Sequence, residues 1–151
     1  MKRIVTLIAL AVFFVGATVC LADSPQMGTW KLNEAKSKIA PGAPKNTTVV
    51  YEAAGDSVKV IVDGVDGTGN PSHSEWTGKF DGKFYAVTGD PTSDMRSYRK
   101  INNHTLGLTG KKDGKVNLTG RIVVAANGRS RTVTTRAAGS KVSTRAVYDK
   151  Q

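Results

Sequence analysis

The sequence has 151 residues, 22 of them Lys or Arg and 12 of them Asp or Glu, which is a length suited to one compact domain and too short for several. Hydrophobic residues make up 39% and charged residues 23%, which excludes wholesale disorder and a collagen-like chain. Two His and one Cys are a poor set for metal or nucleophilic chemistry, so we predict no catalytic residues, no metal site and no cofactor.

The first segment has the pattern of an export signal. Met1–Arg3 supply positive charge, residues 4–15 form an almost unbroken apolar run, and a small residue, Ala22, ends the segment. We predict that residues 1–22 are a signal peptide cleaved after Ala22. Residues 23–151 would then form a single domain without cysteine, either periplasmic or extracellular. Retention at a membrane through an uncleaved N-terminus is the alternative.

Beyond this segment, the apolar residues follow the two-residue period of strands and not the period of a helix. Val58, Val60 and Val62 alternate with polar or outward positions, as do the residues of 116–124. The predicted strands are 28–33, 47–53, 57–65, 72–80, 83–88, 94–101, 105–111, 115–125, 129–136 and 143–149.

Turn signals separate these strands at four places. The pairs Gly55-Asp56, Asp81-Gly82, Asp113-Gly114 and Asn127-Gly128 supply the positive-φ residues that tight hairpins need. Consecutive strands are therefore predicted to be antiparallel neighbours. The even spacing is typical of a sandwich or of an up-and-down β-barrel, and we predict an all-β barrel of about 8–10 strands.

The segment between the first two predicted strands is the only place for a helix. It runs from Glu34 to Asn46, but Pro41 and Pro44 restrict a helix there to about two turns. We therefore predict at most one short helix near residues 34–40.

The two ends of the predicted domain resemble the calycins, which include the lipocalin and fatty-acid-binding barrels. Gly28-Thr29-Trp30 opens the first strand, and the segment from Thr144 to Tyr148 lies in the last. The string from Trp30 to Ser37 is also similar to small exported bacterial proteins of unassigned function. The lipocalin resemblance implies that Trp30 packs under Arg145 and closes the floor of the barrel.

In fatty-acid-binding proteins, an Arg-x-Tyr motif on the final strand grips the ligand carboxylate. Here Arg145 and Tyr148 are three residues apart, so a regular strand places them on opposite faces unless a bulge intervenes. The sequence thus departs from that carboxylate clamp.

A barrel of this size is either filled by side chains or has room for one small ligand. Small residues at Ser74, Gly78 and Gly120 favour a cavity, although they also suit strand curvature. The aromatic residues of the interior can equally be ordinary core. The predicted ligand-binding residues of the interior are Tyr51, Trp76, Tyr98, Leu118 and Tyr148.

Charge is distributed unevenly along the chain. Residues 23–95 have 7 basic and 10 acidic side chains, whereas residues 96–151 have 13 basic and 2 acidic ones. We predict a cationic face formed by Arg129, Arg131, Arg136 and Lys141, which would attract an anionic envelope component or a protein partner. A basic surface that serves only solubility is the simpler interpretation. Specific nucleic-acid binding is disfavoured because exposed aromatic residues are not interleaved with the basic ones.

Two other features do not predict chemistry. His73 and His104 fall at a strand start and in a turn, away from any nucleophile motif. Residues 63–70 lack the spacing of a calcium-binding EF-hand loop. The sequence therefore favours an exported monomeric barrel that binds a small apolar or amphipathic ligand without changing it. The alternative function is a filled barrel that adheres through its cationic face.

Overall fold

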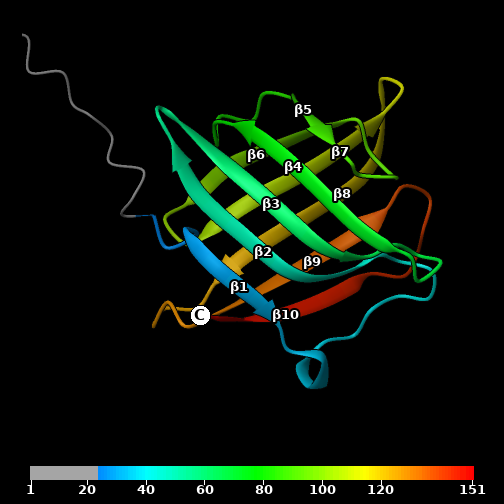
Figure 1. The fold of residues 1–151 in the computed structure, drawn as a ribbon, viewed down its shortest axis with the longest axis horizontal. Coiled ribbons are helices and arrows are strands. Elements are labelled where there is room, and N and C mark those ends of the chain that lie inside the picture. Colours follow the sequence, from blue (N-terminus) through cyan, green and yellow to red (C-terminus); the bar gives the residue numbers. More distant parts are fainter. Residues whose placement is uncertain (1–23) are drawn as a thin grey trace, which may run out of the picture.

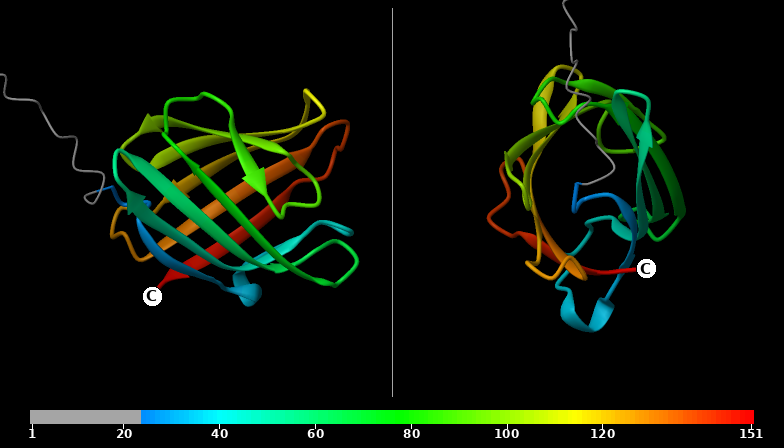
Figure 2. Two further views of the ribbon diagram at one scale, coloured as in Figure 1. Left: turned by 45° about the horizontal axis from the view of Figure 1, so that its top comes forward. Right: turned by 90° about the vertical axis from the view of Figure 1, so that its left-hand side faces the viewer.

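The computed structural model describes residues 24–151, so the predicted signal peptide of residues 1–22 lies outside the described residues. The chain forms a closed antiparallel barrel in which β1 pairs with both β2 and β10 (Figures 1 and 2). This confirms the predicted barrel and excludes the sandwich. The elements are β1 (Gly28–Leu32), η2 (Glu34–Lys36), β2 (Lys45–Ala54), β3 (Ser57–Val65), β4 (Pro71–Gly78), β5 (Tyr85–Thr88), β6 (Met95–Asn102), β7 (Thr105–Lys112), β8 (Lys115–Val124), β9 (Ser130–Ala137) and β10 (Thr144–Lys150).

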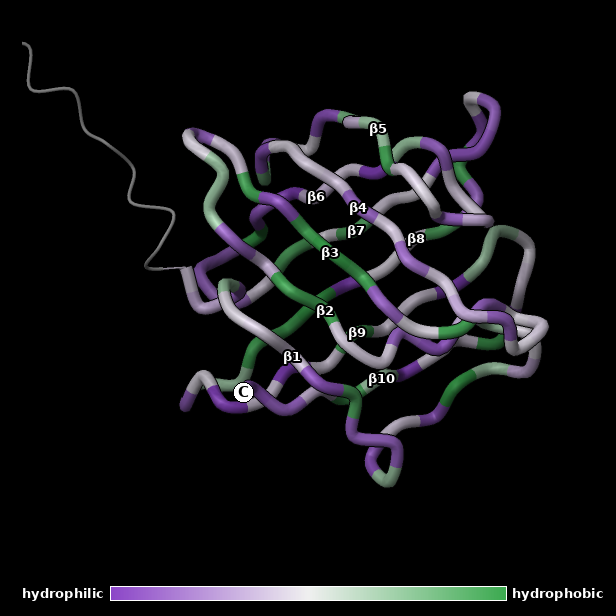
Figure 3. Tube along the Cα trace, viewed as in Figure 1, coloured by the Kyte–Doolittle hydropathy of each residue, from purple (hydrophilic) through white to green (hydrophobic). Residues whose placement is uncertain are grey.

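Side-chain alternation divides each strand between the interior and the outer surface. In β3, Val58, Val60 and Val62 are buried inside the barrel, while Lys59 lies outside and forms an ion pair with Glu75 of β4. Figure 3 shows the resulting mixture of apolar and polar positions along the strands. Burial of one face of each strand fixes the register, because a slip by one residue would expose the apolar side chains.

The hairpin turns follow the predicted chemistry at two sites. Gly55-Asp56 joins β2 to β3, and Asp113-Gly114 joins β7 to β8, each with two residues between the strands. Asp113 and Gly114 both have positive φ, 50° and 77°, as a type I′ turn requires. These two-residue turns place the strands that they join side by side as antiparallel neighbours.

The turn at Asp81-Gly82 differs from the prediction. The strand β4 ends at Gly78 and β5 begins only at Tyr85. The intervening segment pairs with β6, because the Gly82 amide donates to the Tyr98 carbonyl and the Lys100 amide donates to the Phe80 carbonyl. Residues 80–82 therefore lie alongside β6 before the chain enters β5.

The short helix is confirmed as one 3₁₀ turn, η2, in which the Asn33 side chain accepts from the Lys36 amide. The segment around it continues beyond β1 and pairs with the backbone of β10, where Lys38 and Arg145 form a bridge. The Ser37 hydroxyl accepts from the Val147 amide, and the Asn33 amide donates to the Val147 carbonyl. Val147 is itself buried, although it alternates along β10 with Ala146 and Tyr148, which belong to the interior core.

One end of the barrel is closed by the residues that precede β1. Trp30 is fully buried, and its indole N–H donates to the Gln26 carbonyl at 2.9 Å. The Gln26 side-chain amide in turn donates to the backbone carbonyl of His104 in the β6–β7 turn. This end therefore forms a solid floor. Within residues 24–151, no helix is long and apolar enough to cross a membrane.

Candidate functional site: an internal cavity with a buried arginine

The barrel encloses a cavity of about 480 Å³ above this floor, which lies within the range typical of small-molecule sites. Apolar side chains from strands on both sides of the barrel form much of its wall. These are Val49, Val62, Leu108, Leu118, Ile122 and Val133. Three segments border the cavity at the other end of the barrel: residues 40–44, residues 89–92 and the connection that includes Ser140 and Val142.

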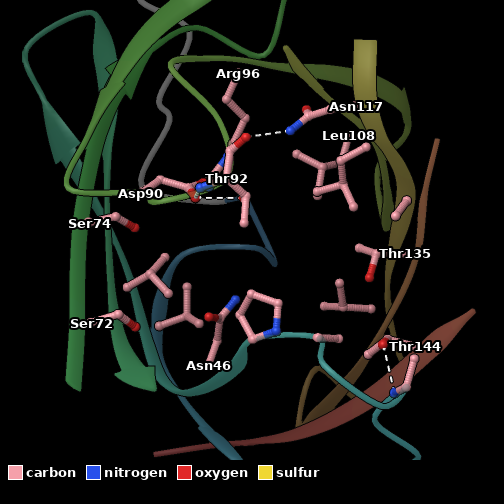
Figure 4. Close-up of a pocket in the computed structure, with 18 of the residues that line it drawn as sticks. Asn46, Ser72, Ser74, Asp90, Thr92, Arg96, Leu108, Asn117, Thr135 and Thr144 are labelled. Atoms are coloured by element: carbon pink, nitrogen blue, oxygen red, sulfur yellow. Dashed lines mark hydrogen bonds and ion pairs between the residues drawn. The ribbon is translucent and has the colours of Figure 1, made fainter. Parts of the chain in front are cut away.

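Polar groups are placed among these apolar side chains. Ser72 and Ser74 face the cavity from β4, and Thr135 and Thr144 face it from the opposite wall (Figure 4). The Thr144 hydroxyl accepts a hydrogen bond from the Ala40 amide at 3.0 Å. The lining therefore suits a molecule with both apolar and polar parts.

The most unusual group in the cavity wall is Arg131, on β9. Its side chain is only 2% exposed. The guanidinium carbon lies 4.8 Å from the ring centres of both Trp30 and Tyr51, and 5.1 Å from that of Tyr148. Three aromatic rings thus hold one cation, each through its electron-rich face.

Arg131 has no anionic partner within residues 24–151. No carboxylate of this part of the chain forms an ion pair with it. Its Nε and Nη1 atoms are buried and have no hydrogen-bond acceptor among residues 24–151. A buried charge with unfilled donors is costly, so these atoms are suited to receive an anion.

The neighbouring phenols cannot supply the missing negative charge. Burial raises the pKa of Tyr148 to about 12, and burial, with a smaller effect from Tyr98, raises the pKa of Tyr51 as well. Both hydroxyls are therefore neutral at physiological pH. The Tyr148 hydroxyl donates to the Asn46 carbonyl at 3.0 Å, which fixes its ring beside Arg131.

A second arginine at the cavity provides a contrast. Arg96 of β6 forms an ion pair with Asp90, whose other oxygen accepts from the amide and hydroxyl of Thr92. The Asn117 side chain also donates to the Thr92 carbonyl (Figure 4). The charge of Arg96 is thus compensated, and its function in this arrangement is to hold the segment 89–92 at the cavity border.

Four of the five residues predicted to line the interior do border the cavity: Tyr51, Tyr98, Leu118 and Tyr148. The fifth, Trp76, lies inside the barrel but does not border the cavity. Its ring packs against Tyr85 and Tyr98, and its indole N–H donates to the Arg96 carbonyl at 3.0 Å. Gly78 leaves room for this packing, since a Cβ there would lie 2.6 Å from the Tyr85 ring.

The predicted contact between Trp30 and Arg145 is wrong. Arg145 points outward and donates to the Lys36 carbonyl at 3.1 Å, whereas Arg131 lies over the Trp30 ring. The register of β10 is continuous from Thr144 to Asp149, without a bulge, so Arg145 and Tyr148 face opposite sides as their spacing predicts.

The predicted cationic face also needs correction. Arg131 is buried and does not belong to the surface. Arg129, Arg136 and Lys141 are exposed, but Arg129 precedes β9 and Lys141 follows it. A strand of this length spans about 27 Å, so these two residues lie at opposite ends of the barrel.

The histidines lie outside the cavity wall. His73 Nδ1 is 2.6 Å from an Asp63 oxygen, and its Nε2 is 3.3 Å from a Glu75 oxygen, which raises the pKa of the exposed imidazole. Among residues 24–151, no group of three or more His, Cys, Asp or Glu side chains is placed to hold a metal ion.

Comparisons with known proteins relate the chain to other barrels by fold alone. No protein-family model matches the sequence, and no curated protein matches it at a significant level. A solved structure of a fatty acid binding protein from Schistosoma mansoni, in complex with arachidonic acid, superposes with a TM-score of 0.53 at 16% sequence identity. The match covers 85% of this chain and 97% of that one. At this identity the likeness shows the fold alone, which is a barrel like that of the fatty acid binding protein.

Proposed function

We propose that this protein binds a small amphipathic molecule inside the barrel, with an anionic head on Arg131 and an apolar tail along the cavity wall. The observation that carries the proposal is the buried guanidinium with two unfilled donors and no anionic partner within residues 24–151. The arachidonic acid bound to the Schistosoma barrel supports this ligand class, because it has the same two parts.

The energetics favour an anion at this position. Each aromatic ring beside a desolvated cation contributes about 0.5–2 kcal/mol, which offsets part of the cost of burying the charge of Arg131. The rings cannot accept the in-plane hydrogen bonds of the guanidinium. A carboxylate has two oxygens in a geometry that matches the arginine fork, so it would fill the free donors and neutralise the charge.

The same site gives no basis for catalysis, and we propose binding without chemical change. The titratable groups that border the cavity are Asp90, Arg96, Arg131 and three tyrosines. Asp90 is engaged by Arg96, and the pKa values of Tyr51 and Tyr148 are raised away from neutrality. Neither of these two phenols is poised to exchange a proton near neutral pH.

The test compares two ligands with a twelve-carbon chain, one with an anionic carboxylate head and one with a neutral hydroxyl head. Dodecanoate and dodecanol would be titrated into the protein by calorimetry. We expect dodecanoate to bind at least about tenfold more tightly, which corresponds to about 1.4 kcal/mol. Arg131→Met should abolish this preference while dodecanol binding persists, because Met keeps the volume and loses the charge.

Arg136→Met is the matched control, since Arg136 lies on the same strand and points outward. It should keep the preference for dodecanoate. Absence of binding of either ligand would contradict the proposed function. An equal preference for dodecanoate in Arg131→Met would show that Arg131 does not receive the head.

Export is part of the proposal and is supported by the sequence of residues 1–22. We expect the protein secreted by its own host to begin at Asp23. N-terminal sequencing of that material tests this expectation, and a retained Met1 would contradict it.

A further inference from the structure

A row of arginines crosses the outer surface of the barrel. The register joins Arg99 of β6 to Gly107 of β7, Gly107 to Arg121 of β8, Arg121 to Thr134 of β9, and Thr134 to Arg145 of β10. We call these five residues, Arg99, Gly107, Arg121, Thr134 and Arg145, the arginine row. Arginine therefore occupies every second strand, with a small or hydroxyl residue between.

The arginine row was not predictable as a cluster from the sequence. Its three arginines are separated by more than twenty residues from one another and come together only through the strand pairing. Strands are spaced by about 4.8 Å, so successive arginines lie about 10 Å apart and the row spans about 19 Å. Such regular spacing matches a ligand with repeated charges.

The charges of this row are not compensated by carboxylates of the described chain. No ion pair involves Arg99, Arg121 or Arg145 within residues 24–151. Arg145 donates one bond to the Lys36 carbonyl, and its remaining N–H groups have no side-chain acceptor in residues 24–151. Asp81 pairs with Arg99 through the backbone only, because its carboxylate accepts from the Lys83 amide and the Tyr85 hydroxyl.

Hydroxyl residues lie beside the arginine row. The neighbouring register row runs from Ser97, which is buried, through Thr109 and Thr119 to Arg136 and contains no Asp or Glu. A groove of about 460 Å³ on this outer face is bordered by Arg121 and Arg136 together with several threonines. Hydroxyl groups donate and accept hydrogen bonds, so the surface offers both charge pairing and hydrogen bonds to an anionic sugar.

The curvature of the surface selects among polyanions. The arginine row follows five of the ten strands, and thus about half of the closed barrel. A flat bilayer would contact only part of such a convex row. A stiff nucleic-acid duplex would also contact only part of it. A flexible single chain can bend around it. The arginine row and its hydroxyl neighbours contain no aromatic residue on which bases could stack, which disfavours single-stranded nucleic acid.

We infer that the outer face of β6–β10 binds a flexible anionic polysaccharide, whose charged sugars lie across the arginine row. This surface is separate from the cavity, because the arginine row points outward from strands whose alternate residues line the interior. The inference therefore adds a second binding site to the proposed ligand carrier and does not depend on it.

The test uses oligogalacturonates of increasing length, with affinity measured by calorimetry at physiological and at high salt. Affinity should rise with length until the chain reaches about 19 Å and then level off. It should fall steeply with salt, because exposed charges are screened beyond about 8 Å at physiological ionic strength. Changing Arg99, Arg121 and Arg145 together to Gln should weaken binding by at least about tenfold.

The matched control changes three exposed lysines outside the arginine row to Gln and so removes the same net charge. Lys83 lies between β4 and β5, and Lys112 and Lys115 lie at the end of β7 and the start of β8. This control variant should retain most of the affinity. Equal losses in the two triple variants would overturn the inference, because they would show only a response to net charge. Tighter binding of oligothymidylate or of anionic phospholipid vesicles would also overturn it. Dodecanoate binding should be unchanged in both variants, which separates this test from that of the cavity.

Discussion

The strand β9 carries two arginines in opposite environments. Arg131 points into the barrel, where Trp30, Tyr51 and Tyr148 surround it, and Arg136, five residues later, points out and contacts the Ser143 hydroxyl. An odd separation along a strand places two residues on opposite faces. The position of an arginine along a strand, odd or even, thus decides whether its side chain is buried in the interior or exposed on the outer surface.

The two environments also differ in energetics. Inside, the medium is poorly polarisable, so the proposed interaction of Arg131 with a single carboxylate would be strong. Outside, water and salt weaken each charge pair to at most about 1 kcal/mol, so binding at the arginine row requires several pairs at once. The same barrel thus has one arginine buried in its interior and several exposed on its outer surface.

The largest effect is expected from the floor that supports Arg131. Trp30→Ala removes a fully buried indole, its hydrogen bond to Gln26 and one of the three rings on the cation. The free energy of unfolding should fall by about 3–5 kcal/mol. Denaturant titration measures this, and a loss below about 1 kcal/mol would show that the floor does not depend on Trp30.

The interior should also make the protein sensitive to alkali. In the folded state, burial raises the pKa of Tyr148 to about 12 and raises that of Tyr51, whereas both should titrate near 10 when unfolded. Their contribution to stability is complete below pH 10 and is lost as the pH rises through the folded values. Each tyrosine should reduce the free energy of unfolding by about 1.4 kcal/mol per pH unit in that window.

Tyr51→Phe and Tyr148→Phe test this account by removing one titrating group each. Each variant should flatten the alkaline slope of the unfolding free energy relative to wild type. An unchanged slope in both would mean that the buried phenols do not control alkaline unfolding.

A smaller effect concerns ligand-linked stability. Dodecanoate at about one hundred times its Kd should raise the free energy of unfolding of the wild type by about 2.7 kcal/mol. At the same ligand concentration, Arg131→Met should lose at least about 1.4 kcal/mol of this gain, while Arg136→Met should keep it. Denaturation curves with and without dodecanoate provide the measurement, and equal gains in all three proteins would erase the distinction between inside and outside.

The smallest effect is expected at His73 on the outer surface. Its hydrogen bonds to Asp63, and then to Glu75, raise its pKa above 6.5, so its contribution to stability is present below 6.5 and is lost as the pH rises through the folded value. The imidazole is exposed, and the contribution should therefore be small and should fade in high salt. His73→Gln should remove this part of the pH dependence of Tm, and a large pH dependence that survives the substitution would place its origin elsewhere.

The sequence predicted the barrel well because its local signals agree with the final structure. The period-two alternation of Val58, Val60 and Val62 gives the inner face, and Asp113-Gly114 gives a tight turn of the correct type. The segment after Gly78 was less predictable, since its pairing with β6 depends on contacts distant in the sequence.

The site was only partly predictable from the sequence. The inward tyrosines follow from alternation, but Arg131 was assigned to the surface because charged residues are usually exposed. The alternation of the strand did indicate the interior, because Arg131 is two residues before Val133, which faces the cavity, and residues two apart share a face. The arginine row depends on the register of five strands, and a single sequence does not specify such a register.

The most direct test of the central account is a crystal structure with ω-bromododecanoate, in which the anomalous signal of bromine marks the tail. We expect the carboxylate to contact Arg131 Nε and Nη1, and the bromine to lie toward residues 40–44 and 89–92. A bromine beside Trp30, with the carboxylate at the opposite end of the cavity, would contradict it.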